Sequence, residues 1–492
     1  MKKILIILIC GLCFGQIEWE IEAFDTVFVS GNDFYFSSMA LDTHTMPYVV
    51  YNKNDFSSIV CALRTDAGWL KEIVESGLFY YGPSIILDDN NTAHVSYYRR
   101  DDAVNKTYVY YAFREYTEWQ IEVVDSSDGS FGAYFWNFNS SIGLDTLGQP
   151  GIAYIAWHEA DSLHYLKYAH FDGFDWDTSI VARDTTWEHR YPLDHSPSLK
   201  FDRNSTPHIA FHRVRADTDS DTIFIAYFDD ALQSWVISPA ICNPHGTYRV
   251  SFTLNSQDYP CIAHGYGYSL AYSWWDGVSW YTDYGIASIG VLHVRISLDV
   301  DSSDRPHILY MHWGIGSPRY CYKDGYWHLC GPVELDTLLL WNEADISLML
   351  DDNNQPHVSY KFAQYISQDI NGIKYAKGKI VGIEERENGI PKSEFKLQIF
   401  PNPFYDKIDI NWQMKNGGYD DTRHLVRNIP EICIYDVTGS LIKRFDYAML
   451  NKADHIVWNG YDNDRRRVPS GVYFIQLQVR DRFIVRKIIK LK

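Results

Sequence analysis

One eleven-residue pattern occurs twice in this chain, as LDDNNTAHVSY at 87–97 and as LDDNNQPHVSY at 350–360. Related segments lie between and before these two, each with an apolar run, a polar turn and an alternating strand. The residue that opens each turn marks seven copies, spaced 44 to 57 residues apart, at Asp42, Asp88, Asp145, Asp202, Asn255, Asp299 and Asp351. A period of this length is typical of a repeat architecture and restricts the possible folds more than any other feature.

Each copy reads as a β-hairpin followed by a second hairpin. The second hairpin has a turn such as Asp172-Gly173 and a last strand that opens with tryptophan. These tryptophans are Trp69, Trp119, Trp176, Trp235, Trp280 and Trp327. Four strands in roughly 50 residues are the dimensions of a propeller blade.

The seventh unit lacks the tryptophan strand, and an additional copy, WEIEAFD, stands at 19–25 ahead of the first unit. Pairing this segment with the last unit closes the ring and removes two open sheet edges. The sequence therefore predicts an all-β fold, with a seven-bladed β-propeller over 16–380 that is closed by its N-terminal strand. Aromatic residues at 16% of the chain agree with this, because their rings pack well on pleated sheets.

A second domain follows a charged, turn-prone linker at 381–394. Residues 395–492 contain alternating strands and tight turns, and their length suits a small C-terminal β-sandwich.

This C-terminal segment resembles the type A sorting domains of the bacterial type IX secretion system. The resemblance rests on Pro401-Asn402-Pro403, on Tyr435-Asp436 with Gly439, on WNGYDNDRRRVPSGVYF at 458–474, and on the basic last strand. Part of the pattern is shared with an immunoglobulin-like domain of flagellar hook-capping proteins. The resemblance implies that residues 395–492 engage the type IX machinery, and that the protein is secreted or held on the outer surface of a Gram-negative bacterium. We read Arg465-Arg466-Arg467, which replaces a single basic position, as a solvated loop.

The N-terminus agrees with export. Lys2 and Lys3 precede an apolar run that is too short to span a bilayer, so residues 1–15 read as a signal peptide. The mature chain keeps Cys61, Cys242, Cys261, Cys321, Cys330 and Cys433, and the sequence leaves their pairing open. Cys321 and Cys330 alone lie close enough in sequence to face each other across one hairpin.

Charge divides the chain and limits its partners. Residues 395–492 carry 17 Lys and Arg against 11 Asp and Glu, whereas residues 16–394 carry 25 against 52. A propeller this acidic repels nucleic acids and anionic membranes, so we expect neither nucleic-acid binding nor membrane insertion. Neutral glycans and peptides remain as ligands, and we expect a monomer.

The Asp-rich turns allow two interpretations. Asp and Asn form turns by hydrogen-bonding their own backbone, whereas several oxygens close together also suit calcium. Their recurrence at turn positions favours the first interpretation, so we expect no cofactor and no metal, with calcium as the alternative. His94, His208, His307 and His357 recur at one strand position and are read as scaffold residues.

Variable loops on one face of a propeller are the usual place for a binding site. The loops between hairpins and between blades mix aromatic and ionisable side chains, a combination that suits glycan or peptide capture. Two inner-strand charges break the repeat near the central channel: Arg295 stands four residues before Asp299, where the six other copies have serine, and Lys200 stands two residues before Asp202. They either hold an acidic group of a ligand or pair with a neighbouring turn Asp. The candidate ligand-binding residues are Arg100, Trp136, His158, Glu159, Trp187, His189, Arg190, Lys200, Arg295, His312, Trp313 and Trp341.

Catalysis is the alternative function. His158-Glu159 and Glu188-His189-Arg190 contain acid–base groups, but neighbouring loop residues define no geometry. The turn at Asp276-Gly277 departs from the aspartate box of sialidase-like propellers, where Asp and Gly are separated by one residue. The sequence therefore predicts a secreted or cell-surface binding protein, with a sialidase-like or other glycan-degrading enzyme as the alternative and no assigned catalytic residue.

Overall fold

The computed structural model of this chain consists of β-strands and turns, with no helix among the residues that it describes. Those residues are 16–28, 36–53, 56–128, 139–158, 160, 163–183, 197–215, 220–243, 250–289, 295–312, 318–334, 345–364, 370–381, 387–388, 395–414, 431–436, 441–445, 455–479 and 482–491. Within these ranges no helix offers the length and apolar character needed to cross a membrane. The chain divides into two compact units, one containing Glu20–Tyr320 and Val333–Lys377 and the other containing Cys321–Pro332 and Gly378–Lys492.

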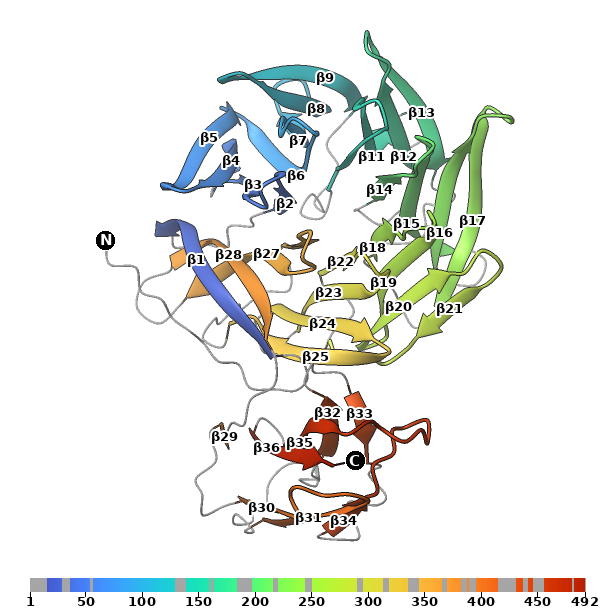
Figure 1. The fold of residues 1–492 in the computed structure, drawn as a ribbon. Coiled ribbons are helices and arrows are strands. Elements are labelled where there is room, and N and C mark those ends of the chain that lie inside the picture. Colours follow the sequence, from blue (N-terminus) through green and yellow to red (C-terminus); the bar gives the residue numbers. More distant parts are fainter. Residues whose placement is uncertain are drawn as a thin grey trace, which may run out of the picture. The chain divides into compact units, whose positions relative to one another are not determined.

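Most of the chain forms four-stranded sheets, seven of them in the described ranges, which follow one another around a ring (Figure 1). We call these sheets blades. Blade 1 contains β2 (Ser37–Leu41), β3 (Pro47–Asn52), β4 (Ser58–Thr65) and β5 (Gly68–Ser76), and blade 2 contains β6 (Phe79–Leu87), β7 (Ala93–Asp101), β8 (Lys106–Glu115) and β9 (Glu118–Asp128). Blade 3 contains β10 (Ser141–Leu144), β11 (Pro150–His158), β12 (Leu163–Phe171) and β13 (Trp176–Arg183), and blade 4 contains β14 (Ser198–Phe201), β15 (Pro207–Arg215), β16 (Ser220–Asp229) and β17 (Ser234–Asn243). Blade 5 contains β18 (Val250–Leu254), β19 (Pro260–Tyr266), β20 (Ser269–Trp275) and β21 (Trp280–Asp283), and blade 6 contains β22 (Ile296–Val300), β23 (Pro306–Met311), β24 (Pro318–Asp324) and β25 (Tyr326–Pro332). Blade 7 contains β26 (Ile346–Leu350), β27 (Pro356–Gln364), β28 (Ile370–Val381) and β1 (Gln16–Phe28). The order β26-β27-β28-β1 confirms that the N-terminal strand completes the last sheet.

The turn between the first two strands has the same construction in every blade. The side-chain oxygen of its first residue accepts the backbone N–H groups two and four residues later at 2.6–2.9 Å, as Asp42 does with His44 and Met46. The fourth residue has a positive φ of 58–78°, a conformation that Asn, Asp and Gly adopt most readily. The recurring Asp and Asn residues therefore form the turns by hydrogen-bonding the backbone.

Blade 6 requires a correction of the sequence alignment. Its turn is opened by Asp301, whose Oδ1 accepts the N–H groups of Ser303 and Arg305 at 2.9 Å, and not by Asp299. Moving the reference residue by two places puts Ser297 four residues before it, where the six other blades also have serine. The sequence alignment predicted that Arg295 replaces that serine, and this prediction is wrong.

These serines connect the inner strands of neighbouring blades into a closed ring. In six of the seven, Oγ accepts a backbone N–H from the inner strand of the next blade at 2.9–3.3 Å, and Ser198 instead donates to the carbonyl of Phe252 at 3.4 Å. The bond from Met39 N–H to Ser347 Oγ joins blade 7 to blade 1. A small hydroxyl is needed here because the strands approach closely and a larger side chain would separate them.

Outer side chains connect neighbouring blades a second time. A carboxylate of one blade's last strand accepts a tyrosine hydroxyl from the second strand of the next blade, as in Asp125 with Tyr154 (2.6 Å) and Glu75 with Tyr97 (2.7 Å). Glu334 with Tyr360 (3.0 Å) and Asp25 with Tyr51 (2.5 Å) repeat the contact. Since Asp25 belongs to β1, the closing strand joins blade 1 in the same way.

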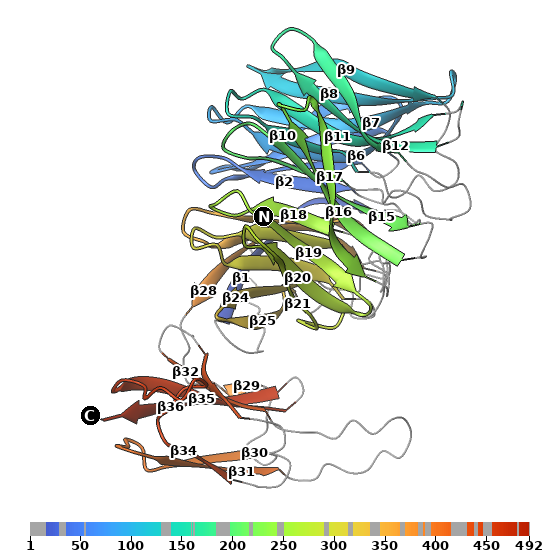
Figure 2. The ribbon, with the colours of Figure 1, turned by 90° about the vertical axis from the view of Figure 1, so that its right-hand side faces the viewer.

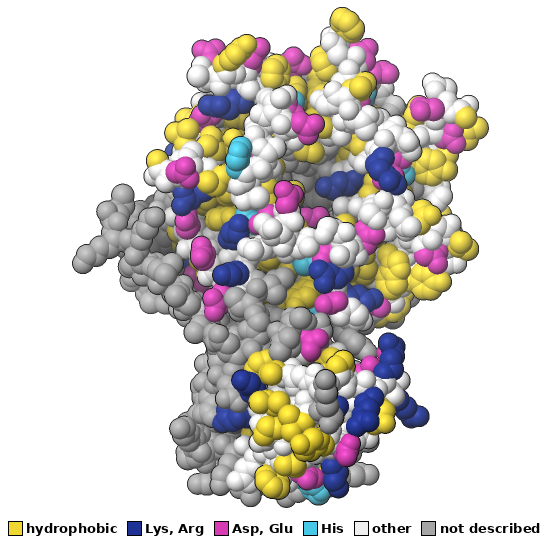
Figure 3. Space-filling view, viewed as in Figure 1, with side chains coloured by type: hydrophobic (Ala, Val, Ile, Leu, Met, Phe, Trp, Pro, Cys, Tyr) yellow, Lys and Arg dark blue, Asp and Glu magenta, His cyan; other side chains and the backbone are white. Residues whose placement is uncertain are grey.

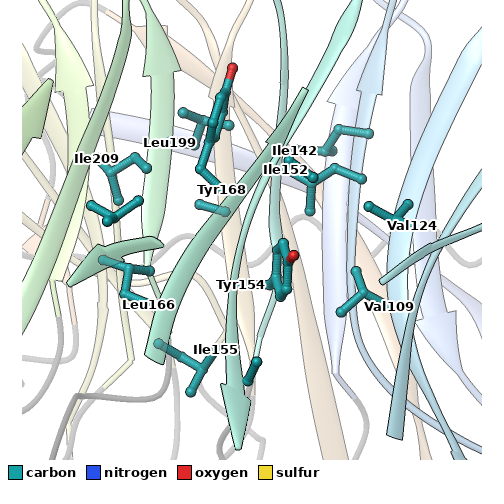
Figure 4. Packing of buried hydrophobic residues seen from close by; sticks show 14 of the residues in the cluster. Val109, Val124, Ile142, Ile152, Tyr154, Ile155, Leu166, Tyr168, Leu199 and Ile209 are labelled. Atoms are coloured by element: carbon teal, nitrogen blue, oxygen red, sulfur yellow. The ribbon is translucent and has the colours of Figure 1, made fainter. Parts of the chain in front are cut away.

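Three of the tryptophans that open the last strands also form a hydrogen bond with the preceding blade. The indole N–H of Trp69 donates to Glu22 (2.9 Å), that of Trp176 to Glu122 (3.1 Å), and that of Trp235 to Ser179 (3.0 Å). Packing between the blades is apolar, and Figure 4 shows Ile152 and Tyr154 of blade 3 beside Val109 and Val124 of blade 2 and near Leu199 of blade 4. The repeated tryptophan is therefore a contact between blades as well as a strand marker.

The two faces of the propeller differ. We call the face with the hairpin turns the turn face; Figure 2 shows these turns projecting together on one side of the ring. The opposite, loop face has the connections between the second and third strands and between blades, and the latter range from two residues (77–78) to fourteen (184–197). All seven first turns, in contrast, have five residues. The turns between the third and fourth strands, also on the turn face, range only from one residue (325) to four (172–175). Most of the variation in length thus lies on the loop face.

The C-terminal unit contains a five-stranded sheet and a three-stranded sheet. In sheet order the strands are β29 (Glu387–Asn388), β36 (Arg482–Lys490), β35 (Gly471–Val479), β32 (Glu431–Asp436), β33 (Leu441–Arg444), and β30 (Phe395–Phe400), β31 (Ile408–Met414), β34 (His455–Trp458). Both sheets contribute to one core around the fully buried Trp458, whose indole N–H donates to the Tyr461 carbonyl at 2.9 Å. Arg465, Arg466 and Arg467 are exposed, as expected for a solvated loop.

Candidate functional site

The loop-face end of the ring centre is surrounded by the residues six places before each turn. In the described ranges these are Phe36, Gly82, Asn139, Arg295 and Asp345. Four of them precede an inner strand, and Gly82 lies within β6. The carbonyls of Phe36 and Arg295 accept the N–H groups of Asn52 and Met311. The start of the first strand therefore fixes where these side chains lie.

Arg295 and Asp345 form an ion pair at this end of the ring. Arg295 Nε lies 2.7 Å from Asp345 Oδ1, and the two side chains are only 7% and 5% exposed. Asp345 Oδ2 accepts the N–H of Ser37 at 3.2 Å, which fixes the carboxylate against blade 1. Buried charges need such partners, since each ion loses its hydration.

An aromatic side chain adjoins this pair. The ring of Phe36 is 2% exposed and packs with Tyr81 and Tyr98, while the Arg295 guanidinium lies 5.7 Å from its centroid. Among the described residues at this position, Arg295 and Asp345 thus balance each other's charge beside the hydrophobic Phe36 ring.

A second pair of charges lies nearer the turn face. Lys200 on β14 and Asp299 on β22 both stand two residues before their turns, and Lys200 is exposed. Burial raises the pKa of the Asp299 carboxyl, and the Lys200 ammonium and the backbone N–H groups of Leu350 and Val300 oppose that rise. Figure 3 shows cationic and anionic side chains interspersed around the ring centre, without a large surface of one sign.

The predicted site residues other than Lys200 fall into three groups. Arg295 pairs with Asp345 and not with a turn Asp. Asp345 stands six residues before the turn of blade 7, as Arg295 does before the turn of blade 6, so the two side chains meet. Arg100, His158 and His312 end the second strands of three blades at the loop face, where Arg100 pairs with Asp102 and the exposed His158 ring contacts Tyr165 edge-on at 5.6 Å. Trp136, Glu159, Trp187, His189, Arg190, Trp313 and Trp341 lie outside the described residues.

The repeated histidines support the turns. Nε2 of His307 and His357 lies 3.4 and 3.3 Å from Oδ2 of Asp301 and Asp351, and Nδ1 of His94 and His357 contacts a tyrosine hydroxyl at 2.6–2.7 Å. Burial lowers the pKa of His357 to about 4, and Lys377 lowers it further while Asp351 acts in the opposite direction. These contacts confirm the scaffold interpretation.

The oxygens of the turns are largely engaged by the protein itself. In blade 6, Asp301 uses Oδ1 for the turn and Oδ2 for Arg305 Nε at 2.6 Å. Across the ranges that the structure describes, no three His, Cys, Asp or Glu side chains group in a way that could hold a metal ion. The six cysteines among the described residues form no disulfide bond. Burial raises the pKa of Cys321, followed by a smaller effect of Cys330.

The sequence of the C-terminal unit identifies the export route. Residues 398–491 match the secretion system C-terminal sorting domain family. Asn402 of the Pro401-Asn402-Pro403 motif donates to the Lys487 carbonyl (2.8 Å) and accepts the Ile489 N–H (2.9 Å), so the motif holds the last strand of the domain. The protein is thus a β-propeller followed by a type IX sorting domain, which indicates export to the cell surface or the medium through the type IX machinery.

Similar solved structures contain enzymes that act on carbohydrates. An α-L-arabinanase of Penicillium chrysogenum complexed with arabinobiose matches with a TM-score of 0.41 and 11% identity, over 61% of this chain and 93% of that one. An α-L-arabinofuranosidase of Fusarium graminearum matches with a TM-score of 0.39 and 10% identity, over 59% and 93%, and the polysaccharide lyase Uly1 with 0.39 and 9%, over 75% and 90%. These likenesses are weak, so the fold assignment rests on the strand order. No curated relative matches this sequence.

Sequence reasoning missed Phe36 and Asp345. Its alignment compared the residues four places before each turn, whereas the variable position lies six places before it. With Asp301 as the reference residue, Phe36, Arg295 and Asp345 fall in one column, which would have found them.

Proposed function

We propose that this protein is a secreted or surface-held seven-bladed β-propeller of a Gram-negative bacterium that binds an extracellular glycan or peptide through its loop face. We further propose a signal peptide at 1–15, the propeller at 16–380, a linker at 381–394 and a sorting β-sandwich at 395–492. The observation that carries the binding role is the contrast between the faces: seven five-residue turns on one side, and connections of two to fourteen residues on the other. A rigid ring that presents variable loops on one face is suited to binding.

The ring centre favours an uncharged ligand. Arg295 and Asp345 neutralise each other beside Phe36, and the propeller segment as a whole is acidic, with 52 Asp and Glu against 25 Lys and Arg in 16–394. An acidic polysaccharide would be repelled by this charge, while neutral sugars can stack on aromatic rings. We therefore place neutral glycans first among the ligands and uncharged peptides second.

A glycan array with the propeller tests this function. The variants Trp136→Ala, Trp187→Ala and Trp313→Ala are expected to lose binding at least tenfold. Phe174→Ala, at a fully exposed tip on the turn face, is the matched control and should bind normally. Turnover of aryl glycosides that disappears in Glu159→Ala or Glu188→Ala would instead establish the glycan-degrading alternative.

The export route is tested separately. Deletion of 395–492 is expected to leave the propeller in the periplasm, detected by cell fractionation. Arg466→Ala, in the exposed turn of the sorting domain, is the control and should be exported. Finding the truncated protein outside the cell would contradict the assigned route without affecting the binding proposal.

A further inference from the structure

The contact between blades 2 and 3 and the contact between blades 7 and 1 contain serines at the same three positions, but their hydrogen bonding differs. Between blades 2 and 3, Ser96 pairs across the sheet with Ser84, and its Oγ lies 2.8 Å from Ser140 Oγ. Ser140 also uses both of its donors on Gly82, since its N–H and Oγ both reach the Gly82 carbonyl, at 3.2 and 2.9 Å. The two blades are in direct contact here, and every hydroxyl has a partner.

The contact between blades 7 and 1, which closes the ring, repeats this arrangement. Ser359 pairs with Ser347, as Ser96 pairs with Ser84, and Ser347 Oγ accepts the Met39 N–H, as Ser84 Oγ accepts that of Ile142. Ser37 precedes Met39 by two residues, as Ser140 precedes Ile142. By this correspondence, the hydroxyls of Ser37 and Ser359 face each other across the closing contact.

Here, however, the direct bonds are missing. Ser37 is 7% exposed and Ser359 is fully buried, and within the described part of the chain neither hydroxyl has a hydrogen-bond partner. Where blade 2 has Gly82, blade 7 has Asp345, and the Ser37 N–H donates to its Oδ2 instead of to a backbone carbonyl. A carboxylate therefore lies between two strands that elsewhere touch directly.

We propose that one water molecule bridges Ser37 Oγ and Ser359 Oγ next to Asp345, at the contact that closes the ring. Buried hydroxyls without partners are destabilising, whereas a water with two to four polar partners satisfies both. Water fits better than a cation, because Arg295 Nε already lies 2.7 Å from Asp345 Oδ1 and neutralises it. The ring is then closed through solvent at one contact and directly at the contact between blades 2 and 3.

A crystal structure of the full chain at a resolution that shows ordered water tests the proposal. We expect a single peak within about 3.2 Å of both serine hydroxyls, the distance of an ordinary hydrogen bond. Direct contact between Ser37 Oγ and Ser359 Oγ, or a different partner for either hydroxyl, would overturn it.

Water-oxygen relaxation dispersion in solution gives a second measurement that needs no crystals. The double variant Ser37→Ala with Ser359→Ala should lose one long-lived water relative to the natural chain. The matched variant Ser96→Ala with Ser140→Ala, at the directly bonded contact, should lose none. Equal numbers of long-lived waters in the natural chain and the first variant would refute the bridging water.

Discussion

At the residue scale, one carboxylate does most to build each blade. Asp351 is 6% exposed, and its Oδ1 accepts the N–H groups of Asn353 and Gln355 while its Oδ2 contacts His357 and Lys377. The next residue, Asp352, is exposed. Two adjacent and chemically identical side chains thus differ in their contacts, and the alignment of the repeats correctly identified Asp351 as the one that opens the turn.

The two aspartates give a direct test of this difference. Asp351→Ala removes the acceptor of two N–H groups of the turn and a contact of the buried His357. It should lower the free energy of unfolding by about 2–4 kcal/mol. Asp352→Ala should change it by no more than about 0.5 kcal/mol, as is usual for exposed positions. Chemical denaturation at pH 7 measures both. Equal effects of the two variants would contradict the role assigned to Asp351.

The buried histidines predict how stability depends on pH. Burial lowers the pKa of His264 to about 4, and its ring contacts Ser273 and the Gly265 carbonyl at 2.9 Å. Between this pKa and the unfolded value of 6.5, the unfolded chain binds the additional proton, so stability decreases as pH falls from about 6.5 towards 4. We expect His264 to contribute a loss of about 1–2 kcal/mol between pH 7 and pH 5.

Denaturation of His264→Gln at both pH values isolates this contribution. The difference in unfolding free energy between pH 7 and pH 5 should be smaller than in the natural chain. The exposed His158 supplies the control, and His158→Gln should leave the difference unchanged. A pH dependence that His264→Gln does not reduce would show that the ring is not kept neutral by burial.

At the element scale, the repeat predicted the blades well and the contacts between them less well. Spacing and turn residues identified four strands per unit, and the displaced WEIEAFD segment identified the closing strand, because both follow from strand periodicity. The alignment failed in blade 6, where Asp299 and Asp301 both precede the turn and only backbone hydrogen bonds distinguish them. The Arg295–Asp345 pair was missed for the same reason, because with Asp299 as the reference residue Arg295 and Asp345 do not fall in one column.

The tyrosine–carboxylate contacts between blades can be tested in one pair. Tyr154 donates to Asp125 at 2.6 Å, and Lys167 also reaches this carboxylate; burial raises the pKa of Tyr154. Blade 4 has Phe211 at the corresponding position, so the ring alone is compatible with the fold. Tyr154→Phe should therefore fold and lose about 1–2 kcal/mol of unfolding free energy, the usual contribution of a hydrogen bond to a charged group.

A double-variant cycle separates this bond from other effects of the substitution. Asp125→Asn alone and combined with Tyr154→Phe should give coupled, non-additive losses, because both changes remove one interaction. Additive losses would mean that the hydroxyl and the carboxylate do not stabilise each other, and that the tyrosine contributes only through packing.

At the scale of the whole molecule, closure depends on a strand that is far in sequence from the sheet it completes. Phe24 of β1 stacks on Trp69 of blade 1 at 4.0 Å between ring centroids, and Glu22 accepts Arg64 Nε at 2.9 Å. A Cβ at Gly372 of β28 would clash with the Asp25 carbonyl, so glycine is required where the strands meet. The first strand thus pairs with blade 7 and also packs against blade 1.

Deletion of 16–28 should therefore expose the edge of β28 together with the apolar surface around Trp69. Open sheet edges pair with other chains, so we expect the truncated protein to associate in size-exclusion chromatography and to unfold at a lower temperature. Because an extended peptide can add to a sheet edge, a synthetic peptide with the sequence QIEWEIEAFDTVF should restore the monomer and the melting temperature. The same peptide with alanine at the Phe24 position should restore little, since removing a buried phenylalanine costs about 3–5 kcal/mol. The exposed Thr26 provides the control, and a peptide with alanine in its place should act like the natural one. A truncated protein that stays monomeric and equally stable would show that the ring holds together without its first strand.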